Sequence, residues 1–154
     1  MIGGLFGLYV AGYTGVLLAV TNRPIWSDTP LLGMLFIVSA GSTSAALILL
    51  LARGSGLTMP GLFSLHRMDA WFLILEFIVL VAVVISLGPV LQAWLNAWGL
   101  LLLLGVIVLG MLLPLMLYWR RGWLGGRSAT TAAALVLLGG FVLRLVIVFS
   151  AEGV

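Results

Sequence analysis

The sequence predicts an all-α integral membrane protein, a bundle of five transmembrane helices that forms a single domain over residues 1–154. Two features of composition indicate this class: 64% of the 154 residues are hydrophobic and only 7% are charged. A chain with so few charges has too little polar surface to cover a soluble core. The apolar residues also fall into long runs separated by short polar turns, as bilayer-crossing helices require.

Each predicted span is close to the length of about 20 apolar residues that crosses a hydrocarbon layer about 30 Å thick. The spans cover residues 1–20, 31–51, 70–90, 95–119 and 129–150. We interpret the first as a true helix and not as a cleaved signal peptide, because it lacks a basic amino-terminal region and an Ala-x-Ala site.

The first span is rich in glycine, which lets neighbouring backbones approach closely inside a membrane. Its phenol, Tyr13, lies about two helical turns before the polar turn that follows. That turn contains Arg23 and Trp26, and an indole is suited to anchor a span at the membrane interface. We therefore expect a hydrogen-bond donor, Tyr13, a short way below a membrane surface.

The second span carries a run of small and hydroxyl residues at 39–46, which can bond to their own helix or to a neighbour. A tight packing face is the favoured interpretation of this run. The lining of a polar cavity or of a quinone pocket is the alternative.

The third span contains Glu76, a carboxyl group that is costly in lipid unless it faces the bundle, is protonated or is paired. His66, Asp69 and Glu76 are separated by three and seven residues, so they share one helical face if the helix extends back to His66. This spacing indicates either a proton path leading inward from one surface or, for the first two, solvated interfacial residues.

The fourth span is rich in leucine and has Pro114 near its end, where a missing backbone donor is tolerated or kinks the helix. The fifth span places Arg144 about two turns from its end. That guanidinium can reach the interface, pair with an acid or bind a ligand oxygen.

The arginines predict the orientation of the chain. The loops at 53–67 and 120–127 hold five of the seven arginines, whereas the turn at 23–28 and the hairpin at 92–98 hold one arginine and one acid between them. The positive-inside rule therefore predicts an amino terminus inside and a carboxyl terminus outside.

This orientation gives sides to the candidate residues. Tyr13 and Arg144 are expected at similar depth below the outer surface. His66, Asp69 and Glu76 are expected to lead in from the inner surface.

The absence of cysteine and the single histidine exclude several kinds of chemistry from this polypeptide. A Cys-ligated iron–sulfur cluster, a zinc site and a pair of haem ligands are not available, so no metal is expected and any redox metal must belong to a partner. The net charge of +3 reports topology, and we expect lipid and not nucleic acid around the chain.

Two segments resemble the polysulfide reductase membrane-subunit (NrfD-like) family. Residues 12–26 combine a Tyr-x-Gly with an Arg-Pro-x-Trp and, together with the small-residue helix that follows, resemble that family's fourth and fifth helices. Residues 138–149, with a Gly-Gly and a following arginine, resemble its last helix. The resemblance covers essentially the whole chain but only the later five of the family's eight helices.

The resemblance implies a multi-pass subunit of the prokaryotic cytoplasmic membrane that binds a quinone, menaquinone or ubiquinone, and no metal or haem. It implies electron transfer between the quinone pool and an iron–sulfur subunit, which in turn serves a catalytic redox subunit. Of the family's quinone contacts, only the tyrosine of the fourth helix has a counterpart, Tyr13. A further membrane chain is therefore expected to supply the missing helices, unless the chain is a fragment.

We therefore expect a non-catalytic, quinone-reactive membrane anchor in which Tyr13 hydrogen-bonds the quinone and Arg144 supplies positive charge. His66, Asp69 and Glu76 form a possible proton path. Two alternatives stay open: an ion- or proton-translocating subunit in which Glu76 and Arg144 line a polar path, and a structural anchor or fragment without redox activity.

Overall fold

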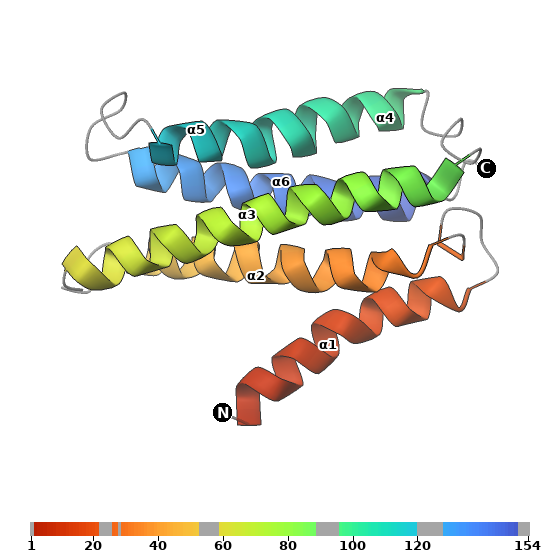
Figure 1. Ribbon diagram of the computed structural model, residues 1–154, viewed down its shortest axis with the longest axis horizontal. Coiled ribbons are helices and arrows are strands. Elements are labelled where there is room, and N and C mark those ends of the chain that lie inside the picture. Colours follow the sequence, from red (N-terminus) through yellow and green to blue (C-terminus); the bar gives the residue numbers. More distant parts are fainter. Residues whose placement is uncertain are drawn as a thin grey trace.

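The computed structural model describes residues 2–21, 26–27, 29–52, 59–88, 96–119 and 128–150, and helices dominate this part of the chain (Figure 1). The elements are α1 (Ile2–Ala19), α2 (Leu31–Leu51), α3 (Met59–Leu87), α4 (Ala97–Leu101), the π-helix η2 (Leu102–Leu112), α5 (Leu113–Trp119) and α6 (Ser128–Ser150). Within these residues five spans are long and apolar enough to cross a membrane, with α4, η2 and α5 forming one of them. The predicted fold class is confirmed.

Helix α3 begins at Met59, eleven residues before the predicted start of the third span at residue 70. Proline at position 60 is compatible with this start, because the first-turn N–H groups of a helix have no intrahelical partner. The helix thus extends back beyond His66, so that one continuous helix carries His66, Asp69 and Glu76, as their sharing of one face requires.

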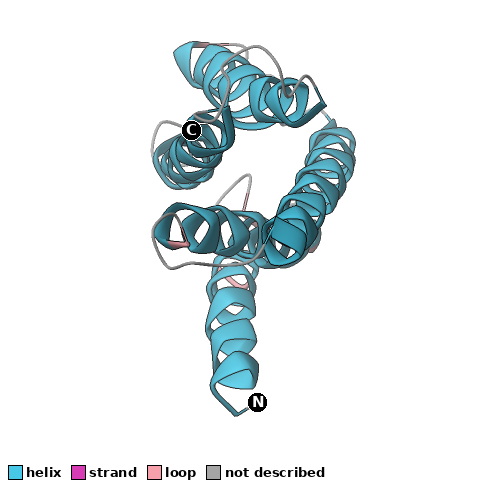
Figure 2. Ribbon diagram, turned by 90° about the vertical axis from the view of Figure 1, so that its left-hand side faces the viewer, coloured by secondary structure: helices cyan, strands magenta, loops and turns pink. Residues whose placement is uncertain are grey.

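Helix α2 is the centre of the bundle. Helices α1, α3 and α6 all pack against it, and α6 packs in turn against the span formed by α4, η2 and α5. Successive spans run in opposite directions (Figure 1). Seen from the end of the bundle, α1 projects away from the other helices (Figure 2).

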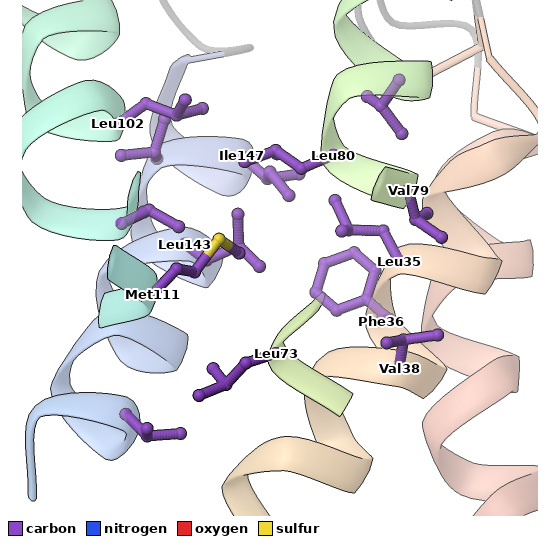
Figure 3. Packing of buried hydrophobic residues seen from close by; sticks show 14 of the residues in the cluster. Leu35, Phe36, Val38, Leu73, Val79, Leu80, Leu102, Met111, Leu143 and Ile147 are labelled. Atoms are coloured by element: carbon purple, nitrogen blue, oxygen red, sulfur yellow. The ribbon is translucent and has the colours of Figure 1, made fainter. Parts of the chain in front are cut away.

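The core is made by apolar side chains that point into the space between α2, α3, η2 and α6 (Figure 3). Leu35, Leu80, Leu143 and Ile147 are all at most 1% exposed. These helices also carry apolar residues on their outer faces, as expected of helices surrounded by lipid.

Two pairs of glycines bring helix backbones together. A Cβ atom on Gly15 of α1 would lie 2.2 Å from the Cα of Gly33 in α2. A Cβ atom on Gly139 of α6 would lie 2.3 Å from the Cα of Gly110 in η2. A larger residue does not fit at Gly15, Gly110 or Gly139, whereas a Cβ atom on Gly33 would make ordinary contacts at 3.9 Å or more. Gly15 thus packs the first helix on one side, as expected of small residues in membrane helices.

The fourth span accommodates Pro114 through a change of hydrogen-bond register. The π-helical run Leu102–Leu112 precedes the proline, and the N–H of Leu113 bonds to the carbonyl of Val108, five residues back. A proline ring crowds the carbonyl four residues earlier in an α-helix, and the wider π-turn relieves that crowding. Local π adjustment is one way in which membrane helices tolerate proline.

Candidate functional site

A carboxyl group is buried in the interior of the bundle. Glu76 of α3 is 3% exposed, and the Ser42 hydroxyl of α2 donates a 2.8 Å hydrogen bond to its Oε2 atom. The sequence allows Glu76 to face the bundle, to be protonated or to be paired. In the structure its side chain faces the bundle and is hydrogen-bonded by α2.

Arg144 of α6 approaches the same serine from the other side. Its Nη1 atom donates to the carbonyl of Gly140 at 2.8 Å and to the Ser39 hydroxyl at 3.4 Å. The guanidinium also lies over the ring of Phe36, 5.9 Å from its centroid, where a cation is attracted to the aromatic face.

These residues form one polar chain that joins three helices. Arg144 of α6 donates to the Ser39 hydroxyl of α2, and Ser42 of α2 donates to the Ser39 carbonyl and to Glu76 of α3. Hydroxyl groups that both donate and accept can link a guanidinium to a carboxyl group in a place that water does not reach.

The hydroxyl residues at 39–46 of α2 form hydrogen bonds both within their own helix and to a neighbouring helix. Ser42 donates to the carbonyl of Ser39 as well as to Glu76, and Thr43 donates to the carbonyl of Ser39 at 2.8 Å. Ser39 and Ser42 are fully buried. The run is therefore a packing face that also supplies the polar atoms between α3 and α6.

A second cluster lies toward the start of α3. Asp69 is fully buried, and its Oδ2 atom accepts a hydrogen bond from the Tyr118 hydroxyl of α5. The ring of His66 meets the ring of Tyr118 edge to face, with centroids 5.2 Å apart. Asp69 is thus not a solvated interfacial residue.

Tyr13 lies apart from both clusters. Its side chain is 49% exposed, and its ring stacks on that of Tyr9 at 5.9 Å. Helix α1 meets α2 at Gly33 and Ile37, whereas Arg144 meets α2 at Ser39. The structure gives Tyr13 and Arg144 different neighbours on different faces of α2.

The turn between α1 and α2 is held against α6. Trp26 donates from its indole nitrogen to the carbonyl of Ile147 at 2.9 Å. That carbonyl lies in the last turn of α6, where carbonyls have few intrahelical donors. Arg23, the other residue singled out in this turn, lies outside the described residues.

Reasoning from the sequence missed Tyr118 as a site residue and did not assign Ser42 to Glu76. Tyr118 stands beside a tryptophan and two arginines, a pattern typical of a membrane interface. The signal that could have found these residues is the need of a buried carboxyl group for a donor on a neighbouring helix.

The described residues contain no group of three or more histidine, cysteine, aspartate or glutamate side chains that could hold a metal ion. What they offer instead is hydrogen bonding, proton exchange and the guanidinium of Arg144 inside the bundle.

The comparisons with known proteins agree with the membrane architecture. A family model described as polysulfide reductase (NrfD_2) matches residues 1–153. Neither the curated proteins nor the solved structures contain a match.

Proposed function

The chain belongs to the polysulfide reductase (NrfD_2) family, and from this premise we propose that it is the quinone-reactive membrane subunit of a respiratory redox complex. The family and the five spans indicate a multi-pass membrane subunit of such a complex. The finer proposal adds the quinone, the route of its protons and the partners that take its electrons.

One observation carries the proposal: the polar chain from Arg144 through Ser39 and Ser42 to Glu76 in the mainly apolar interior of the bundle. Ionisable residues inside a membrane are costly, and where they occur they usually serve ligands, ions or protons. A purely structural bundle of this size can be packed with leucine, valine and glycine alone.

Tyr13 is the proposed quinone contact. Its phenol is half exposed on a face of α1 that the described residues leave uncovered, so its hydroxyl can donate a hydrogen bond to one carbonyl of a quinone. A bound quinone would exchange electrons and protons with its surroundings. Because its other carbonyl also needs a donor, we propose that helices of a further membrane chain complete the site.

Arg144 and the acidic residues have proposed roles around that site. Arg144, at a depth similar to Tyr13 in the predicted topology, is proposed to supply positive charge, from a position beside Ser39 and not beside Tyr13. His66, Asp69 and Glu76 hold and pass protons from the inner surface, since they follow one another along a single helix.

The proposed partners follow from the absence of cysteine and the single histidine of this chain. Electrons leave or reach the quinone through an iron–sulfur subunit and a catalytic redox subunit. The proposed location is the cytoplasmic membrane of a prokaryote, with the arginine-rich loops inside.

The test is the replacement Tyr13→Phe in the assembled complex, followed by quinol-linked turnover. We expect a rise in KM for the quinone or a loss of turnover of at least tenfold, because one charge-stabilising hydrogen bond is removed. Tyr9→Phe is the matched control, since it removes a phenolic hydroxyl from the ring that stacks on Tyr13. Equal turnover in both variants and the native complex would remove Tyr13 from the quinone site.

A second candidate function is ion or proton translocation without redox chemistry. The polar chain between Arg144 and Glu76 favours it, because such pairs also line transport paths. Flux measured across liposomes that contain this chain alone, with no quinone, separates the two functions. Flux that is lost in Glu76→Gln supports translocation. If the native chain gives no flux, translocation by this chain alone is rejected.

A further inference from the structure

One oxygen of a buried carboxyl group has no hydrogen-bond partner among the described residues. Asp69 is fully buried, its Oδ2 atom accepts from the Tyr118 hydroxyl, and its Oδ1 atom is buried and unpaired. Buried carboxyl oxygens are nearly always hydrogen-bonded, so an unpaired one calls for a role. The oxygen is where a proton can add.

The surroundings of Asp69 connect it to the surface and to the interior. His66 lies one turn earlier on α3, is partly exposed, and contacts the Tyr118 ring. Glu76 lies seven residues later on the same face, about 10 Å further along the helix. In the described part of the chain, the titratable groups facing Asp69 are thus His66 and Glu76 from α3 and Tyr118 from α5.

Tyr118 decides which oxygen of Asp69 is available. Its hydroxyl comes from α5, at the far end of the span that contains the π-helix, and it donates to Oδ2 alone. A carboxyl group held at one oxygen by a rigid donor has a fixed rotamer, and its other oxygen is presented in one direction.

We propose that Asp69 is a proton-holding residue at the inner end of the bundle and that Tyr118 is the residue that positions it. One N–H bond of the His66 imidazolium breaks as the proton adds to Oδ1 and forms one O–H bond, while Oδ2 continues to accept from Tyr118. The proton arrives from the inner surface by way of His66 and leaves toward Glu76, and no electron moves. This inference rests on the proposed function for the use of the proton, but Tyr118 is new to it.

Infrared difference spectroscopy of the full chain in lipid nanodiscs tests the proposal. Spectra taken between alkaline and acidic buffer should show a carboxylic acid C=O band that is absent in Asp69→Asn. Tyr118→Phe should keep the area of this band and shift its frequency, because one hydrogen bond to the carboxyl group is lost. Tyr9→Phe, an exposed phenol, should leave the band unchanged.

Two results would overturn the proposal. They are an acid-form spectrum that Asp69→Asn leaves unchanged, and a band frequency that Tyr118→Phe leaves unchanged. Should either variant fail to fold, labelling native protein with aspartate carrying ¹³C in its carboxyl group must shift the band. A band that does not shift is not from aspartate, and the proposal then fails.

The experiment is separable from the test of the quinone site. The infrared bands need neither quinone nor partner subunit, whereas Tyr13→Phe is assayed in the assembled complex. An Asp69 band together with a neutral Tyr13→Phe would retain the proton-holding residue and reject the quinone contact.

Discussion

At the scale of single residues, the buried Ser39, Asp69 and Glu76 are each met by a side chain from another helix. Ser42 bonds Glu76 across α2 and α3, Tyr118 bonds Asp69 across α5 and α3, and Arg144 reaches α2 from α6. An unpaired polar group in a membrane interior is costly, so these bonds favour one rotation of each helix over others.

The sequence predicted one side of each of these contacts. The spacing of His66, Asp69 and Glu76 along one helix follows from helical periodicity, and the structure places the latter two in the interior. Their donors could not be predicted, because a contact between helices depends on the rotation and register of both. Ser42 and Tyr118 carry no pattern of their own that indicates a partner.

Replacing Ser42 by alanine should destabilise the protein. The hydroxyl gives Glu76 a 2.8 Å hydrogen bond, and hydrogen bonds between membrane helices contribute about 0.6–1.7 kcal/mol. We expect Ser42→Ala to lower the free energy of unfolding by about that amount, measured by titration with SDS in mixed micelles. Ser44→Ala, an exposed serine on the same helix, is the control. A larger loss in the control would mean that the hydrogen bond is unimportant.

At the scale of elements, α6 owes its place to two adjacent glycines that face different neighbours. Gly139 contacts Gly110 of η2, whereas a Cβ atom on Gly140 would lie 2.5 Å from Cγ2 of Thr43 in α2. The approach on the Gly140 side brings Arg144 within reach of Ser39. The close packing of α6 and the position of its guanidinium therefore have the same cause.

An alanine at position 139 should force α6 and η2 apart. Its Cβ atom would meet backbone at 2.3 Å, a contact that a side-chain rotation cannot relieve. Overpacking of this kind costs about 1–3 kcal/mol. We expect Gly139→Ala to lower the mole fraction of SDS at which the protein unfolds. Gly3→Ala should leave it unchanged, because nothing lies within 4 Å of a Cβ atom at this position. Similar behaviour of the two variants would contradict the close packing of α6 on η2.

Element boundaries show where prediction from sequence reached its limit. Hydropathy gave the second span and the end of the fourth as they are found, since both coincide with changes from apolar to polar residues. Helix α3 starts at Met59, ahead of the third span predicted at residues 70–90, because a helix can continue past the apolar run. His66, Arg67 and Asp69, which resemble an interfacial loop, lie within this helix. The π-helix has no hydropathy signal, since its register change depends on how Pro114 is accommodated.

At the scale of the whole molecule, the bundle is unevenly covered. The core from α2 to α6 is closed by buried leucine and valine, whereas the glycine contacts of α1 with α2 lie in its second half, at Gly12 and Gly15. The Cβ positions of Gly3, Gly4 and Gly7 have nothing within 4 Å, and Tyr9 is 67% exposed. The phenol of Tyr9 and the glycine backbone in this half of α1 are poorly suited to contact with lipid alone.

The open side of α1 should therefore lie against another membrane chain in the native complex. The chain contains no cysteine, so a single cysteine can be placed at Gly7 and used for crosslinking in native membranes. We expect Gly7→Cys to form an adduct with a second membrane protein through a short thiol-reactive crosslinker, because small residues at a helix surface favour close approach. Ile78→Cys, 60% exposed on α3, is the control and should crosslink at least fivefold less. Equal yields at the two positions would mean that α1 faces lipid, and the quinone site at Tyr13 would then lack the second donor that its chemistry requires.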